Sequence, residues 1–137
     1  MARKVKSFFI RSALLLVLVA WSADSPLANA AVSQPETVLV NFHVKEGQEN
    51  QLTRLLSDAW EIYKKHGMVR SNPHTVLRGK DSAGKPLVVE IFTWKDSSVP
   101  DTAPSDVRAV WKSMEALCEA RAGESGINFT EMEIVEP

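Results

Sequence analysis

The sequence predicts an α+β domain in which two helices cover one face of a four-stranded antiparallel sheet. Segments with the two-residue period of strands alternate with two segments of helical period, in the order β-α-β-β-α-β. A tight turn joins the two central strands, and the chain shows no internal repeat or second domain. Two β-α-β halves of this kind pack into a single sheet with both helices on the same side.

The first 30 residues have the features of a secretory signal peptide. Four basic residues accompany the apolar stretch SALLLVLVAW (12–21), and Ala28-Asn29-Ala30 has the small-x-small pattern of a signal peptidase site. A span that crosses a bilayer needs about 20 apolar residues, which this stretch does not reach. We therefore predict that residues 1–30 are cleaved, and that the protein is periplasmic or secreted with no membrane association after cleavage.

The composition of the remaining chain favours some partners over others. Residues 1–30 hold four of the 16 basic and one of the 17 acidic residues, which leaves 12 basic and 16 acidic groups and a net charge of −4. This balance, without a basic stripe, argues against nucleic acid as a partner. Cys118 is the only cysteine, so no disulfide can form within one chain, and packing or an oligomer must stabilise so small an exported domain.

The domain itself is predicted over residues 37–137, after a flexible leader at 31–36. Gly67 is expected to cap the first helix at its C-terminus, and Pro104 suits the first turn of the second. Both helices carry an apolar stripe, which in the second includes Trp111 and Cys118. The expected strands are 37–44, 74–78, 86–94 and 127–135, and the expected helices run through 48–66 and from about 104 to 118. This order is the ferredoxin-like arrangement.

The turn at 81–84 sets the register of the central hairpin. If Gly84 takes the left-handed conformation, the loop has three residues and Asp81 opposes Lys85. Arg78 then opposes Val88, Val76 opposes Glu90 and His74 opposes Phe92. A loop of two or four residues would place Thr75 and Leu77 beside Glu90 instead. We favour the three-residue loop, in which His74, Arg78 and Glu90 share one face.

The strand 86–94 is apolar on both faces, and Glu90 stands out within it. Leu87, Val89, Ile91 and Thr93 are nearly all apolar, so we expect this set to face the helices. Glu90 and the aromatic Phe92 and Trp94 would then lie on the free face, together with Leu39, Asn41 and His43 of the first strand. A mixed apolar and polar face of this size predicts a covering partner, and hence a homodimer that encloses a barrel-like interior.

Two short motifs resemble a known superfamily, the dimeric α+β barrels. They are VKEG at Val44–Gly47, before an amphipathic helix, and the strand end at 90–96, with Glu90, Trp94, Lys95 and Asp96. Within that superfamily the chain is most similar to antibiotic-biosynthesis-monooxygenase-type domains. The resemblance implies a homodimer with a cavity between sheet and helices or within the barrel. Some relatives oxidise phenolic substrates with dioxygen and no cofactor, others degrade haem, and many have no known activity.

The haem-degrading branch is similar at Trp94 and, about one position away, at Asn41. Its haem-ligating histidine lies on the second helix, whereas this chain has no histidine after His74. Without that ligand, haem chemistry of this type is not expected, and we expect no other cofactor and no metal. His43, His74 and Glu90 offer only a weak metal pattern at their large separations.

Two functions remain open from the sequence: an exported protein that binds a small apolar or aromatic molecule, and a cofactor-independent oxygenase. In the oxygenase, Glu90 would be a general base and His43 or His74 would move protons. Asn41, Arg78, Phe92 and Trp94 are the expected ligand-binding residues. In a purely structural alternative, Glu90 forms a buried ion pair with Arg78 or one across the dimer, and Trp94 anchors the dimer. Trp60 and Trp111 are expected to serve packing only.

Overall fold

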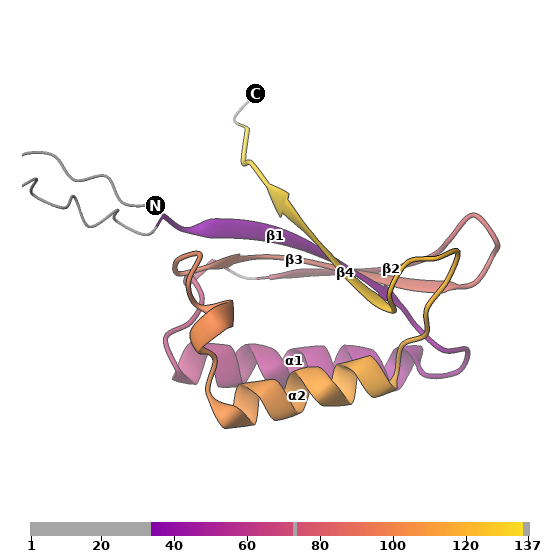
Figure 1. The fold of residues 1–137 in the computed structure, drawn as a ribbon, viewed down its shortest axis with the longest axis horizontal. Helices are drawn as coiled ribbons and strands as arrows, with labels where there is room; N and C mark the ends of the chain where they lie inside the picture. The colour runs from indigo at the N-terminus through magenta and orange to yellow at the C-terminus, as the bar shows by residue number, and fades with distance from the viewer. Residues whose placement is uncertain (1–33, 73, 136–137) are drawn as a thin grey trace, which may run out of the picture. The chain divides into compact units, whose positions relative to one another are not determined.

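The computed structural model describes residues 34–72 and 74–135, so the predicted signal peptide and its cleavage site lie outside the described residues. Within them, two helices lie on one face of a four-stranded antiparallel sheet of order β2-β3-β1-β4 (Figure 1). This confirms the predicted element order. The elements are β1 (Glu36–His43), α1 (Glu49–Lys65), β2 (Thr75–Lys80), β3 (Pro86–Trp94), the short 3-10 helix η1 (Pro100–Thr102), α2 (Ser105–Ala116) and β4 (Ile127–Met132).

Helix α1 packs against the sheet through an apolar face and ends where glycine permits it. Leu52, Leu56 and Ala59 on this face are fully buried. Gly67 has φ +62°, and the N–H of Met68 donates to the carbonyl of Tyr63 at 3.0 Å. This is a Schellman ending, as the sequence predicted. Neither helix that the structure describes is long and apolar enough to cross a membrane.

The β2–β3 hairpin has the predicted register. Gly84 has φ +77°, and the N–H of Gly84 donates to the carbonyl of Asp81 at 2.9 Å. The Asp81 carboxylate also accepts the N–H groups of Ala83 and Lys85, each at 2.9 Å. These hydrogen bonds close a three-residue loop, and this loop sets Val76 opposite Glu90. The turn residues alone therefore determine which β2 side chains share a face with Glu90.

The predicted facing of β3 is wrong. Pairing with β1 sets Val40 opposite Glu90 and Phe42 opposite Val88, so the Glu90 set shares the helix-facing side of Val40. Val88, Glu90, Phe92 and Trp94 are buried, whereas the set expected under the helices, Leu87, Val89, Ile91 and Thr93, lies half-buried on the open face. The reason is that both faces of this central strand are apolar, so alternation could not distinguish them. The facing of β1 was predicted correctly, and its register with β3 shows which face of β3 meets the helices.

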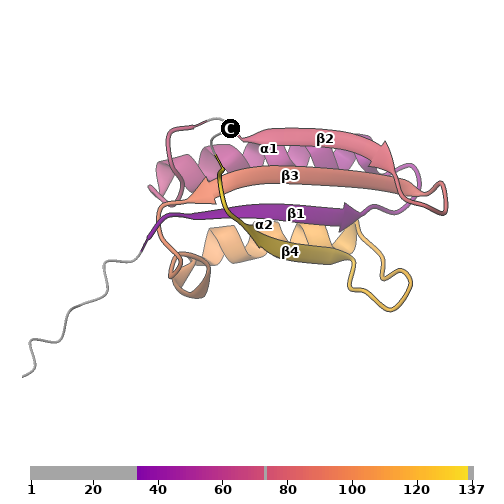
Figure 2. The ribbon, with the colours of Figure 1, turned by 90° about the horizontal axis from the view of Figure 1, so that it is seen from above.

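The other face of the sheet is not covered by any element that the structure describes (Figure 2). Leu77 of β2 is 53% exposed there, and Met132 of β4 is 45% exposed. The strand β4 is shorter than predicted and ends at Met132. The two apolar residues after it, Ile134 and Val135, are also exposed. The open face thus combines the half-buried apolar residues of β1 and β3 with exposed ones at both edges.

Candidate ligand-binding cavity

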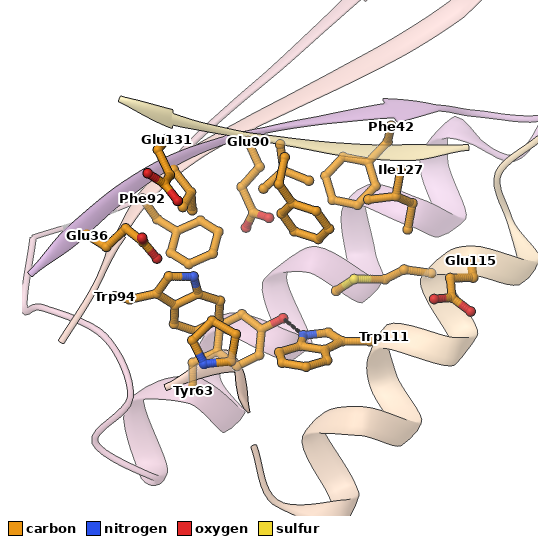
Figure 3. A pocket seen from close by; sticks show the side chains of 15 residues that line it. Glu36, Phe42, Tyr63, Glu90, Phe92, Trp94, Trp111, Glu115, Ile127 and Glu131 are labelled. Atoms are coloured by element: carbon orange, nitrogen blue, oxygen red, sulfur yellow. Dashed lines mark hydrogen bonds between the residues drawn. The ribbon is translucent and has the colours of Figure 1, made fainter. Parts of the chain in front are cut away.

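A cavity of about 420 Å³ lies between the sheet and α2, and Glu90 is part of its lining (Figure 3). Six aromatic side chains contribute to the wall, from β1, α1, β3, α2 and β4. The rest is aliphatic, apart from four carboxyl groups. The lining residues are Glu36, Val38, Val40, Phe42, Tyr63, Glu90, Phe92, Trp94, Pro100, Trp111, Met114, Glu115, Ile127, Phe129 and Glu131. A lining of this kind, apolar with a few polar groups, is typical of sites for small organic molecules.

The aromatic rings hold one another in place at one end of the cavity. Phe92 and Trp94 make an edge-to-face contact with ring centroids 4.6 Å apart, and Trp94 and Tyr63 lie 5.3 Å apart. Trp111 completes the group, with its ring 6.3 Å from that of Trp94. Offset and edge-to-face contacts of this kind fix ring orientation as well as burying area. The prediction that Phe92 and Trp94 could hold a ligand is therefore compatible with where the structure places them.

A hydrogen bond between Trp111 and Tyr63 joins α2 to α1 across this end of the cavity. The indole N–H of Trp111 donates to the Tyr63 hydroxyl at 2.6 Å, as drawn in Figure 3. Burial raises the pKa of Tyr63 above its ordinary value, so the phenol stays protonated at neutral pH. Trp111 was expected only to pack, but it lines the cavity and orients Tyr63. Helical spacing could not reveal this, because an apolar stripe does not distinguish a core from a cavity wall.

Glu90 is a buried carboxyl group, and the described residues offer it no ion-pair partner of fixed charge. Its residue is 3% exposed, and its Oε1 atom accepts no hydrogen bond from the part of the chain that the structure describes. Burial raises its pKa to about 8, because the charged form loses its hydration. The nearest cationic candidate, His74, places Nε2 3.7 Å from Oε1. Burial and then the charge of Lys64 lower the pKa of His74, so at neutral pH this pair consists mainly of two neutral groups.

Arg78 does not pair with Glu90, which corrects the structural alternative considered from the sequence. Its guanidinium reaches the start of α1 instead, where it donates to Asn50 Oδ1 at 2.9 Å and also to Thr53 Oγ1. Arg78 shares the strand face of Glu90, as its register predicted, but it is exposed and does not line the cavity. An arginine side chain is long enough to choose among several acceptors, so register alone could not identify its partner.

Asn41 and His43 lie on the opposite side of the sheet from Glu90. Asn41 pairs with Val89 of β3 and Asn128 of β4, and both strand neighbours of Val89 face the helices. His43 points to the loop after α2, with Nε2 4.0 Å from the Glu124 carboxylate. The expected grouping of Asn41, His43 and Glu90 in one interior is therefore not formed within the chain. Because His43 lies on the opposite side of the sheet from Glu90, the residues His43, His74 and Glu90 do not come together as metal ligands within one chain.

Three further carboxyl groups, Glu36, Glu115 and Glu131, were not predicted as site residues. Glu36 at the start of β1 and Glu131 in β4 both have helix-facing positions, and Glu115 lies on α2. Burial raises the pKa of Glu36, and the negative charge of Glu131 raises it further. A signal was present in the sequence. Glu36 has the parity of Val38, and Glu131 has that of Ile127, so each interrupts an inward-facing apolar series.

Comparison with known proteins places the fold but not the activity. No protein-family profile matches the chain, and neither does any curated protein sequence. A crystal structure of a dimeric ferredoxin-like protein of unknown function from Jannaschia sp. CCS1 superimposes with a TM-score of 0.55. It is 16% identical and covers 73% of this chain and 99% of its own. The chain has a ferredoxin-like fold.

A second solved structure supports the same conclusion. A conserved protein from Methanosarcina mazei Go1 superimposes with a TM-score of 0.52 at 12% identity. The match covers 74% of this chain and 95% of that protein. At such low identities the likeness concerns the arrangement of strands and helices. Function must therefore be argued from the cavity and its residues.

Proposed function

We propose that the protein is an exported homodimer that binds a small aromatic or apolar molecule in the cavity between the sheet and α2. The observation that carries this is the combination of aromatic walls with a buried Glu90 carboxyl whose Oε1 atom accepts no hydrogen bond from the described residues. An unsatisfied buried polar group costs about 1–3 kcal/mol. A purely structural core would gain by replacing Glu90 with an apolar residue, whereas a binding site gains a polar contact that orients its ligand.

The binding proposal can be tested by blocking the cavity. Ile127 lines it from the edge strand β4, so Ile127→Trp should fill part of the space. Exposed Ile134 offers a matched control, Ile134→Trp, that adds the same bulk outside the cavity. Ligand-observed NMR with a panel of small aromatic compounds should detect binding to the native protein and the control, and weaker binding to Ile127→Trp. Absence of binding to the native protein, or equal binding to all three, would contradict the proposal.

The homodimer is proposed to form through the open face of the sheet. Its apolar residues from β1 and β3, with Leu77 at one edge, need a cover. The Jannaschia protein of the same fold is described as dimeric. Leu77→Glu should shift the protein towards monomer in light scattering after size exclusion. Ala109→Glu, on an exposed position of α2, should leave the dimer intact. A native monomer would count against the proposal.

Export is proposed from the sequence of residues 1–30. Expression of the full chain in a bacterial host with a periplasm should yield a protein in that compartment whose intact mass begins at Ala31. Recovery of the uncleaved chain from the cytoplasm would contradict this part of the proposal.

A cofactor-independent oxygenase is the second candidate, favoured by the pKa of Glu90 near 8 inside an aromatic cavity. Glu90 would accept the proton of a phenolic substrate. One atom of dioxygen would enter the ring and the other would leave as water, with the phenol oxidised to a quinone. Oxygen uptake with phenolic compounds that bind would reveal this activity. Glu90→Gln should abolish uptake while the phenol still binds, and binding without any uptake would exclude the oxygenase for those compounds.

A further inference from the structure

The ionisable groups that line the cavity are all acidic. Glu36, Glu90, Glu115 and Glu131 contribute carboxyl groups, and no lysine, arginine or histidine is among the described lining residues. These carboxyls come from β1, β3, α2 and β4; Glu90 is buried, whereas Glu115 and Glu131 are exposed. An anionic ligand would find carboxyl groups and no cationic side chain among the described lining residues. A cation would find several carboxylates to offset its charge.

Glu90 supplies the independent observation that points to a ligand. It is 3% exposed, and Oε1 has no hydrogen-bond partner within residues 34–72 and 74–135. In Figure 3 its carboxyl group projects from β3 into the space between the sheet and α2. The groups that face it are His74, before β2, and Tyr63, on α1. Neither carries a fixed positive charge, and Arg78 is bound to α1. The cation that would satisfy Glu90 is missing from the described part of the chain.

The aromatic walls indicate what kind of cation would fit. Tyr63, Trp94 and Trp111 present ring systems to the same space, and the negative faces of such rings attract ammonium groups. A metal ion would need several close oxygen or nitrogen ligands, and no such group of three His, Cys, Asp or Glu side chains occurs among the described residues. Carboxylates together with aromatic faces suit an organic ammonium ion with an apolar body.

We propose that the cavity binds an organic cation, an amine or quaternary ammonium compound, whose charged nitrogen lies against Glu90 and whose apolar part lies along the aromatic wall. This inference rests on the proposed binding function and adds the chemical class of the ligand. Binding would stabilise the ionised form of Glu90. Since the carboxyl is mainly protonated in the empty protein at pH 7, about one proton should be released for each cation bound.

The test uses three probes with one carbon skeleton: 3-phenylpropan-1-amine, 3-phenylpropan-1-ol and 3-phenylpropanoate. Isothermal titration calorimetry of the purified protein at pH 7 should show the amine binding at least tenfold more tightly than the alcohol, and the carboxylate binding weakest. Repeating the amine titration in buffers of different ionisation enthalpy measures the proton released. We expect Glu90→Gln to reduce the preference for the amine to less than threefold and to abolish the proton release.

Two further variants complete the design. Glu46→Gln removes an exposed carboxylate in the turn before α1, outside the cavity, and should bind the amine like the native protein. Glu115→Gln removes an exposed lining carboxylate of α2. It should weaken the affinity for the amine about two- to threefold without affecting folding. It tests the same charge preference if Glu90→Gln fails to fold.

The outcomes distinguish the proposed binding function from the proposed cationic nature of the ligand. Tighter binding of the amine, lost with Glu90→Gln and kept with Glu46→Gln, supports both. Equal binding of the amine and the alcohol, or tightest binding of the carboxylate, overturns the cation inference and leaves the binding function standing. If no probe binds and the aromatic panel described above also fails, the cavity is not a binding site and both are overturned. If the panel binds but the amine does not, only the cation inference falls.

Discussion

Two buried ionisable side chains, Arg121 and Glu90, differ sharply in how they are satisfied. Arg121 is 8% exposed as a side chain and contacts two carboxylates, Asp81 at 3.2 Å and Glu119 at 3.0 Å. Its guanidinium also donates to the carbonyls of Pro86, at 2.7 Å, and Val44. Glu90 is buried as deeply but has only the neutral His74 nearby, at 3.7 Å.

The difference shows what each charge does for the fold. Arg121 fastens the loop after α2 to the hairpin turn and to the ends of two strands, and its donors are used within the chain. Such a group stabilises a particular arrangement of backbone. Glu90 holds no other segment of the described chain in place, and its carboxyl group is available to a bound ligand. We interpret the first as structural and the second as part of a ligand site.

The largest expected effect is a pH dependence of stability that belongs to Glu90. Its pKa is raised from 4.5 to about 8 on folding, so the folded protein binds the proton more tightly than the unfolded chain. Its contribution is complete below pH 4.5 and is lost as the pH rises through 8. Relative to Glu90→Gln, the native free energy of unfolding should fall by about 4 kcal/mol between pH 5 and pH 9.

Urea denaturation of the native protein and Glu90→Gln across this pH range measures the difference, in which other titrating groups largely cancel. Parallel stability curves for the two proteins would mean that Glu90 is hydrated or paired, and the contrast with Arg121 would disappear.

Removal of Arg121 should have the next largest effect. Arg121→Met keeps much of the apolar stem but leaves the Asp81 carboxylate and the Pro86 carbonyl without their donor. We expect a loss of about 3 kcal/mol in the free energy of unfolding, near the lower end for breaking a buried ion pair. Urea denaturation at pH 7 measures it, and binding of aromatic probes to the cavity should be unchanged. A loss below that of an ordinary surface substitution would show that the contacts of Arg121 are incidental.

The smallest expected effect concerns the bond between Trp111 and Tyr63. Trp111→Phe keeps an aromatic ring on α2 but removes the indole N–H that the Tyr63 hydroxyl accepts. The free energy of unfolding should decrease by about 1 kcal/mol, while the affinity of probes that contact the aromatic wall changes more. Tryptophan fluorescence titration of the variant, in which Trp60 and Trp94 both contribute to the signal, provides the affinity. Changed stability with unchanged affinity would place Trp111 outside the binding site.

The sequence was sufficient for the local structure and insufficient for the inward face of β3. Gly84 fixed the hairpin register because only a left-handed residue there closes a three-residue loop, and Gly67 likewise fixed the end of α1. On β3, Leu87, Val89 and Ile91 are as apolar as the residues that face the helices, so the pattern did not indicate which face of the strand is buried. Only pairing with β1, which depends on the whole sheet, resolves it.

The candidate site was predicted in part for the same reason. Glu90, Phe92 and Trp94 were identified as an unusual group on one strand, and they do line one cavity. Asn41 and His43 were placed with them because the β3 face was reversed. Tyr63 of α1 and Trp111 of α2 were missed because the apolar stripe of each helix has the pattern of a packed core, although α2 leaves a cavity beside the sheet.

The protonation state of Glu90 tests most directly whether this carboxyl belongs to a ligand site. Carbon-13 labelling of glutamate side chains allows each carboxyl group to be followed by NMR as the pH changes, with Glu90→Gln identifying the signal. We predict one carboxyl that titrates near pH 8 and whose midpoint falls by at least about two pH units when 3-phenylpropan-1-amine saturates the protein, because a fall of this size releases most of the proton at pH 7. A Glu90 signal that titrates between pH 4 and 5 without any ligand would contradict it.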